Sequence, residues 1–215
     1  MDAPAPAPAW LDTFHSFSPL HALVVLALAS AMIASCLLGR RWRGRPAERT
    51  LRSAWAWSTI AWQSAAVVWW LLPANFDPME SLPIHVCDLA AWVAPLALLT
   101  QRRWLRTMLY FWGIGLSTQA FLTPVLQEGP AHVKFWFFWV GHTQIVGSAI
   151  YDLVVLRYRP ARRDFLTAVA ISFVYTLAML AFNIATGANY AYVGNTAPDR
   201  PTIIDALGAW PLRVV

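Results

Sequence analysis

Three reactive side chains stand close together at the start of an apolar run. His85, Cys87 and Asp88 belong to the sequence Leu82-Pro83-Ile84-His85-Val86-Cys87-Asp88. An ionisable residue inside a membrane segment is costly, so its presence there predicts a functional site. The combination of imidazole, thiol and carboxyl favours a catalytic site over simple helix packing. Cys87 is then the candidate nucleophile, with His85 or His142 as the candidate general base.

Helix geometry limits how these groups combine. Pro83 suits the first turn of a helix, so we expect the helix to begin there. His85 and Asp88 are then three residues apart and can meet, whereas His85 and Cys87 point to nearly opposite sides. Asp88 could orient His85 as a carboxylate does in a catalytic triad, and Cys87 could pair with His142 from another segment.

No known cofactor motif accompanies these residues. HExxH, EF-hand, P-loop and GxGxxG patterns do not occur in the sequence. We therefore expect no cofactor and no metal, with a metal site formed by His85, Asp88 and His142 as the less favoured alternative.

The surrounding sequence predicts a membrane protein. Of the 215 residues, 58% are hydrophobic and only 13% are charged, whereas a soluble domain carries about 25% charged residues. Apolar runs recur, and a membrane-spanning helix needs about 20 such residues. We predict an all-α, polytopic transmembrane helix bundle of six spans, with a truncated seventh. The six predicted spans are 20–38, 54–73, 83–100, 107–124, 135–156 and 165–186.

The spans divide the chain into three parts. We expect residues 1–19 to form an extracytoplasmic Ala/Pro-rich leader, which is not a signal peptide because it lacks Lys and Arg. Residues 20–186 form the helix bundle. Residues 187–215 form an extracytoplasmic loop and the start of a final span.

Most basic residues lie in alternate loops, and this predicts the orientation. By the positive-inside rule these loops are cytoplasmic, so the chain is a multi-pass cell-membrane protein with its N-terminus outside. We expect anionic headgroups of the inner leaflet as partners of these loops. We expect no nucleic acid, because no reading module accompanies the charge. The basic residues of the three loops are Arg40, Arg41, Arg43, Arg45, Arg49 and Arg52, then Arg102, Arg103 and Arg106, then Arg157, Arg159, Arg162 and Arg163.

This topology assigns most of the polar residues to the outer half of the bundle. Polar groups at membrane depth face an interior where they satisfy one another, so we predict one outer-half cavity that binds substrate. In the inner half, Asp152 is expected to pair with Arg157. The alternative is that single polar residues only hold helices together, which is the favoured interpretation for Gln63 and Gln119 taken alone. The predicted substrate-binding residues are Gln119, Gln144, Asn183, Asn189 and Tyr190.

Four blocks of sequence resemble a known family. Leu82-Pro83-Ile84-His85-Val86-Cys87-Asp88-Leu89, Gly141-His142, Asn189-Tyr190-Ala191-Tyr192 and Asp205-Ala206-Leu207-Gly208-Ala209-Trp210-Pro211 occur in this order. Together they resemble the bacterial YwaF integral membrane proteins, which are related to the eukaryotic transmembrane protein 164. The resemblance implies a cysteine acyltransferase that moves an acyl chain between phospholipids, with His85 and His142 matching two histidines of the relatives.

The chain departs from these relatives at one position. Their acylated cysteine directly precedes the histidine, where this chain has Ile84, and the nearest thiol is Cys87. The resemblance therefore implies the site more directly than the reaction. We predict a phospholipid acyltransferase or lipid hydrolase that acts on membrane phospholipids. The alternatives are a non-enzymatic lipid or amphiphile binder or transporter, and a membrane scaffold.

Overall fold

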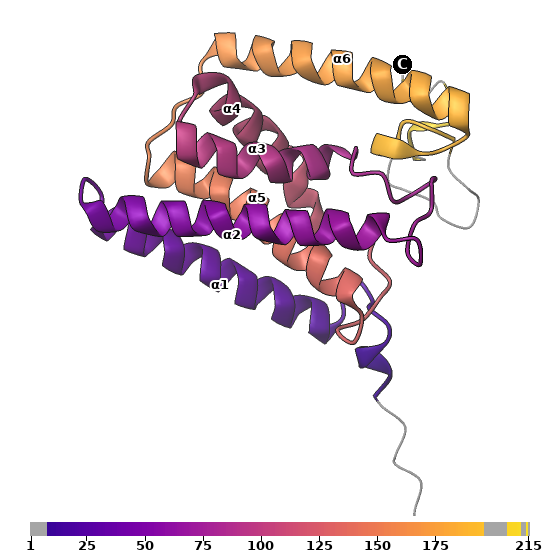
Figure 1. The fold of residues 1–215 in the computed structure, drawn as a ribbon, viewed down its shortest axis with the longest axis horizontal. Helices are drawn as coiled ribbons and strands as arrows, with labels where there is room; N and C mark the ends of the chain where they lie inside the picture. The colour runs from indigo at the N-terminus through magenta and orange to yellow at the C-terminus, as the bar shows by residue number, and fades with distance from the viewer. Residues whose placement is uncertain (1–7, 196–205, 212–213, 215) are drawn as a thin grey trace, which may run out of the picture.

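The computed structural model describes residues 8–195, 206–211 and 214, and this part of the chain is helical without a β-strand. The all-α prediction is therefore confirmed. Figure 1 shows α1 and α2 side by side, α3, α4 and α5 in the middle, and α6 along one side. The α-helices are α1 (Pro19–Arg41), α2 (Pro46–Leu71), α3 (Val86–Thr100), α4 (Arg103–Met108), α5 (Val133–Val154) and α6 (Arg162–Thr186). The short helices are η1 (Ala9–Leu11), η2 (Leu109–Ile114), η3 (Ser117–Phe121) and η4 (Tyr190–Tyr192).

Two of the described helices, α1 and α6, are long and apolar enough to cross a membrane by length and composition. The apolar helix α3 has only 15 residues, fewer than the roughly 20 that a perpendicular crossing needs. Each of the six predicted spans coincides with helical structure, but the six-span bundle is not confirmed.

The fourth predicted span is not one continuous helix, which corrects the sequence-based expectation. It begins as α4, widens into the π-helix η2 and ends in the 3₁₀-helix η3. The Ser117 hydroxyl donates to the Trp112 carbonyl (3.0 Å) and the Thr118 hydroxyl to the Ile114 carbonyl (2.6 Å). These bonds compete with regular helix bonds, and Gly113 and Gly115 disfavour a helix interior.

Small side chains make α3 the centre of the packing. Its buried alanines leave room for the close approach of α2, α4 and α5, all of which contact α3. Close approach of small residues is a common way for apolar helices to associate in membranes. The buried alanines of α3 are Ala90, Ala91, Ala94 and Ala97.

The helix ends agree with local sequence signals. The Ser18 hydroxyl accepts from the His21 N–H (3.2 Å) before α1, and Pro19 occupies the first turn. The Asp164 carboxylate accepts from the Ala161 N–H (2.7 Å) at the start of α6. After its last residue, Thr186, that helix is capped by Gly187, whose φ of 77° is the left-handed conformation that glycine adopts without strain.

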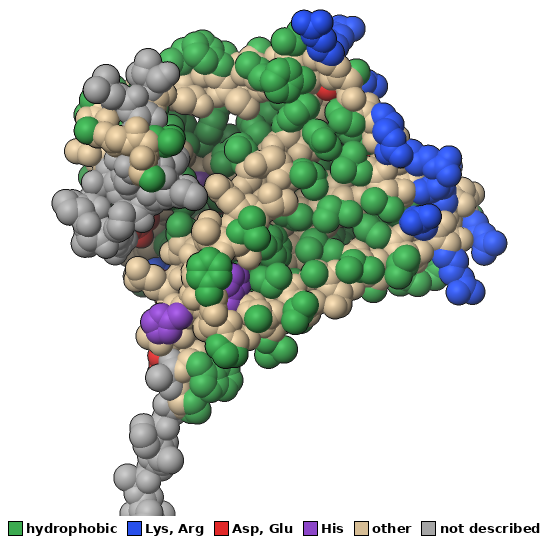
Figure 2. Space-filling model, turned by 180° about the vertical axis from the view of Figure 1, so that it is seen from behind, with side chains coloured by type: hydrophobic (Ala, Val, Ile, Leu, Met, Phe, Trp, Pro, Cys, Tyr) green, Lys and Arg blue, Asp and Glu red, His purple; other side chains and the backbone are tan. Residues whose placement is uncertain are grey.

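The basic side chains gather at one end of the molecule, as Figure 2 shows. The loops from α1 to α2, α3 to α4 and α5 to α6 all meet there (Figure 1). The opposite end carries the connection from α2 to α3 and the η4 loop. Which end faces the cytoplasm stays a prediction.

The two terminal predictions fall partly outside the described residues. Residues 1–7 of the leader are not described, but Phe14 is 3% exposed and packs against Phe135 and Trp139. The leader joins the rest of the molecule from Leu11 onward, because the carbonyls of Leu11 and Asp12 accept from the backbone N–H groups of Ala131 (2.8 Å) and Gly129 (2.9 Å). Of the residues 211–215 that would begin a final span, only 211 and 214 are described.

Candidate functional site

His85 lies just before α3 and not within it. Its backbone is extended (φ −62°, ψ 154°), and the helix begins at Val86. The expectation that the helix begins at Pro83 is therefore wrong. The Asp88 carboxylate accepts a hydrogen bond from the backbone N–H of His85 (3.0 Å). Asp88 thus fixes the backbone of His85 and caps the helix, and this bond does not engage the imidazole.

A loop that follows α6 covers the His85 ring. The backbone N–H of Ala191 donates to His85 Nδ1 (3.3 Å). The rings of Tyr190 and Tyr192 lie 5.0 and 5.6 Å from the imidazole, measured between ring centroids. Ala191 and Tyr192 both have left-handed backbones, with φ of 56° and 60°. Such strain in non-glycine residues persists only where the surroundings impose it, and it is common at functional sites.

Asn183 anchors this loop to α6. Its side-chain amide donates to the Tyr190 carbonyl (2.8 Å) and accepts from the Tyr190 N–H (2.9 Å). Asn183 is buried at 3% exposure and Tyr190 at 0%. Asn183 was predicted to bind substrate; both of its described hydrogen bonds go to Tyr190.

The Tyr190 phenol ties the loop to the segment before His85. Its oxygen accepts from the Leu82 N–H (3.0 Å) and donates to the Pro78 carbonyl (3.0 Å). Burial raises the pKa of the Tyr190 and Tyr192 phenols, so both remain protonated at neutral pH. The loop and the segment before α3 are therefore joined around the imidazole.

These hydrogen bonds distinguish the two histidines. A backbone N–H can only donate, so Nδ1 of His85 is an acceptor and its proton resides on Nε2. His142 Nδ1 lies 2.8 Å from the Phe138 carbonyl, which can only accept. The proton of neutral His142 is therefore on Nδ1, and its Nε2 carries the free lone pair. His85 presents an N–H donor, whereas His142 presents a base.

Cys87 lies between an apolar cluster and polar groups. It packs against a buried cluster that includes Met108, Trp112 and Ile145. Its thiol is free, and among the described residues no hydrogen bond joins it to a histidine nitrogen. The predicted pairing of Cys87 with His142 stays a prediction. Hydrogen bonds of catalytic groups are often absent without substrate and form in the complex.

Two further residues that the sequence did not single out as site residues complete the polar group. The buried Gln63 of α2, expected to hold helices together, contacts the Asp88 carboxyl through its side-chain amide. The Tyr175 hydroxyl of α6 donates to the Ile84 carbonyl (2.8 Å). An isolated tyrosine in an apolar segment is also typical of a membrane interface, so Tyr175 could not be chosen as a site residue from its sequence context. We define the His85 site as His85, Cys87, Asp88, Gln63, Tyr175, Tyr190 and Tyr192.

Of the remaining predicted residues, Gln119 and Gln144 have no described contact with this site. Gln119 is exposed on η3, and Gln144 is buried on α5. Asn189 is half-buried, and its carbonyl accepts from the Tyr192 N–H (3.3 Å), while its side-chain oxygen accepts from the Gly194 N–H (2.9 Å). A substrate-binding role for the three stays a prediction. Among the residues that the structure describes, no group of three His, Cys, Asp or Glu side chains could hold a metal.

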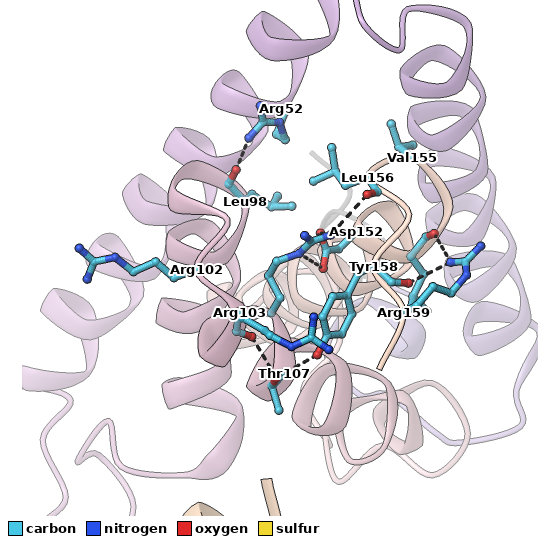
Figure 3. Close-up of polar contacts among 12 residues, drawn as sticks. Arg52, Leu98, Arg102, Arg103, Thr107, Asp152, Val155, Leu156, Tyr158 and Arg159 are labelled. Carbon is cyan, nitrogen blue, oxygen red and sulfur yellow. Dashed lines mark hydrogen bonds and ion pairs between the residues drawn. The ribbon is translucent and has the colours of Figure 1, made fainter. Parts of the chain in front are cut away.

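A second polar cluster lies at the basic end of the molecule (Figure 3). Asp152 pairs with Arg106 (2.9 Å) and not with Arg157, so the sequence-based pairing is wrong. Arg103 makes two bonds to the Asp164 carboxylate (2.9 and 2.6 Å). The positions of α4, α5 and α6 explain the difference: they bring Arg106 and Arg103 from α4 against carboxylates of α5 and α6.

The same end contains a buried tyrosine and a buried glutamate. The hydroxyls of Thr107 and Tyr158 lie 2.9 Å apart, and burial raises the pKa of Tyr158. Glu48 pairs with Arg52 (3.1 Å) and accepts from the Tyr151 hydroxyl (3.0 Å). Because every carboxylate of this cluster has an arginine partner, its evident role is to join helices.

Comparison with known families shows the family of this chain. The model of the TMEM164 family matches residues 15–215. The chain belongs to the TMEM164 family. Comparison with curated proteins and with solved structures finds no match. The resemblance that the sequence blocks carried is confirmed at the level of this family, while the bacterial YwaF branch stays a prediction.

Family membership and composition together identify a TMEM164 family membrane protein. The match covers the His85 site and both apolar helices, α1 and α6. The number of membrane crossings, the kind of membrane and the orientation stay predictions.

Proposed function

We propose that this TMEM164 family protein transfers acyl groups of membrane lipids at the His85 site. The observation that carries the proposal is the position of Cys87, which packs against an apolar cluster beside a group of polar side chains. A lipid ester has the same two-sided character, with an acyl chain on one side of the reacting carbonyl and glycerol oxygens on the other. The cluster would receive the chain and the polar groups would hold the ester.

The proposed reaction forms an acyl-cysteine intermediate. The Cys87 thiol loses its proton to Nε2 of His142, and the sulfur attacks the ester carbonyl. The Nε2–H of His85 donates to the carbonyl oxygen as negative charge develops there. The C–O bond breaks, the departing alcohol takes the proton from His142, and a thioester remains on Cys87. A lysolipid hydroxyl then attacks the thioester, gives its proton to the thiolate and restores the thiol; water in its place gives hydrolysis.

The alternative is a protein that binds a lipid without transforming it. The observation that favours this alternative is the lack of a described hydrogen bond between Cys87 and a histidine nitrogen. A binder needs the apolar cluster and the polar group but no thiolate.

Reconstitution separates the two functions. The purified chain would be placed in vesicles that contain a phospholipid with a labelled acyl chain and an unlabelled lysolipid. We expect labelled acyl chains to appear on the lysolipid. Cys87→Ala should abolish this transfer, whereas Cys36→Ala should retain it, because Cys36 packs in a separate cluster with Leu98 and Tyr151.

Replacements of the histidines test their separate roles. His142→Gln should lower transfer at every pH, since an amide cannot act as a base. His85→Asn keeps an N–H donor and should retain more transfer than His85→Ala. Bound phospholipid without transfer, unchanged by Cys87→Ala, would establish the binder instead.

A further inference from the structure

A basic groove lies at the opposite end of the molecule from the His85 site. It is open, has a volume of about 430 Å³ and is lined by four arginines and two apolar residues. Arg40 lies in the last turn of α1 and Arg43 lies just after that helix. The other two arginines lie in the loop after α5. The groove is lined by Arg40, Arg43, Leu153, Val154, Arg157 and Arg159.

Two of these guanidinium groups are held in place by backbone carbonyls. Arg43 donates to the carbonyls of Val155 (2.7 Å) and Val154 (2.5 Å), where α5 ends. Arg159 donates to the carbonyls of Leu153 (3.0 Å) and Tyr158 (2.9 Å), as Figure 3 shows. The carbonyls of Leu153, Val154 and Val155 are among those that a helix leaves unpaired at its C-terminus, so these bonds complete the end of α5, whereas the Tyr158 carbonyl lies in the loop that follows. They also place the guanidinium groups before any ligand arrives.

The positive charge of the groove is not neutralised within the described part of the chain. No carboxylate there lies within ion-pair distance of the four arginines, although Arg52, Arg103 and Arg106 each have such a partner. Burial and then the neighbouring charges of Arg157 and Arg40 lower the pKa of Arg43, and the smaller opposing effect of the Glu48 carboxylate does not reverse this. The groove thus concentrates like charges, which an anion would stabilise.

An exposed apolar face of α1 leads to the groove. Ile33 and Leu37 are each 59% exposed. They stand seven and three residues before Arg40, so all three lie on one face of the helix. α1 is also one of the two helices apolar enough to cross a membrane. A lipid chain lying along Ile33 and Leu37 would therefore bring its headgroup to Arg40.

We propose that the basic groove binds the phosphate headgroup of an anionic phospholipid whose acyl chains lie along the Ile33–Leu37 face of α1. Arginine suits this ligand because its planar group donates two parallel hydrogen bonds to phosphate oxygens. The apolar side chains of Leu153 and Val154 in the lining accept the glycerol carbons next to the phosphate. This site is independent of acyl transfer at the His85 site.

Lipid binding by the full chain tests the proposal. The purified protein in detergent would be titrated with phosphatidic acid, with phosphatidylcholine and with inorganic phosphate, and bound molecules counted by native mass spectrometry. The test variant is Arg40→Gln/Arg157→Gln, because the structure describes no hydrogen bond from either side chain that the fold would lose. The matched control is Arg49→Gln/Arg102→Gln, which removes the same charge from exposed positions at the same end.

We expect phosphatidic acid to bind in preference to phosphatidylcholine. The groove variant should lose at least about tenfold in affinity, since two of four charged donors are removed, while the control changes little. Equal losses in the two variants would overturn the proposal, because they would show attraction to general surface charge. Equal affinity for inorganic phosphate and phosphatidic acid would overturn the assignment to a lipid. Unchanged binding in the groove variant, with an unfolding temperature like that of the native chain, would also reject the site.

Discussion

Replacement of Asn183 by leucine tests how the loop is held over His85. Asn183→Leu places an apolar side chain of similar size in α6. The replacement removes both hydrogen bonds to the Tyr190 backbone, of 2.8 and 2.9 Å. Tyr190 is fully buried, so while the loop stays docked its N–H would lack a partner, and its carbonyl would keep only the longer bond from the Val193 N–H (3.4 Å). Undocking would let water reach both groups.

The expected magnitude follows from the unpaired N–H. A buried polar group left without a partner costs about 1–3 kcal/mol, so the docked loop should be destabilised by at least about 1–3 kcal/mol. Since about 1.4 kcal/mol corresponds to a factor of ten, even the lower limit increases the open population by about fivefold. The His85 ring loses the Ala191 N–H in each molecule whose loop is open.

Amide hydrogen exchange measures this opening. Peptides that cover residues 188–194 should exchange at least about fivefold faster in Asn183→Leu, in proportion to the open population. The matched control is Thr167→Leu, a polar-to-apolar replacement at a half-buried position at the other end of the same helix. If the loop exchanges at the native rate in Asn183→Leu, Asn183 does not anchor it and the reasoning fails.

Two further replacements test the packing at the basic end. Asp152→Asn leaves the Arg106 guanidinium, 16% exposed, without its charge partner. This should destabilise the fold by about 3–5 kcal/mol. An unfolding temperature equal to that of the native chain would contradict this expectation. In Gly39→Ala the new Cβ would lie 2.5 Å from the Tyr151 ring, which should cost about 1–3 kcal/mol. Gly141→Ala meets no atom within 4 Å and serves as its control, so equal melting temperatures for the two alanine variants would refute the close contact.

Runs of apolar residues and the positions of the charged residues predicted where most of the helices lie. Runs of apolar residues located α1, α2, α5 and α6 to within a few residues, except at the start of α2. There the helix begins at Pro46, because charged residues such as Glu48 and Arg52 form buried ion pairs that hydropathy does not detect. The break in the fourth segment depends on hydroxyl-to-carbonyl bonds of Ser117 and Thr118, and single-residue patterns do not reveal these bonds.

The sequence located the reactive residues of the site better than their partners. His85, Cys87 and Asp88 follow from the cost of polar groups in an apolar run. The hydrogen bond to the His85 ring comes from the backbone N–H of Ala191, which carries no side-chain signal and lies more than a hundred residues away in the sequence. The pairing of Asp152 with Arg106 likewise depends on the relative positions of α4 and α5, which spacing along one helix does not determine.

The most direct test of acyl transfer is to detect the acyl group on Cys87. The reconstituted chain would be incubated with phospholipid alone, without lysolipid, and analysed by intact mass and peptide mapping. We predict one acyl group on the peptide that contains Cys87, removable by hydroxylamine as a thioester and absent in Cys87→Ala. An acyl group on Cys36, or transfer to lysolipid at the native rate in Cys87→Ala, would contradict the proposed function.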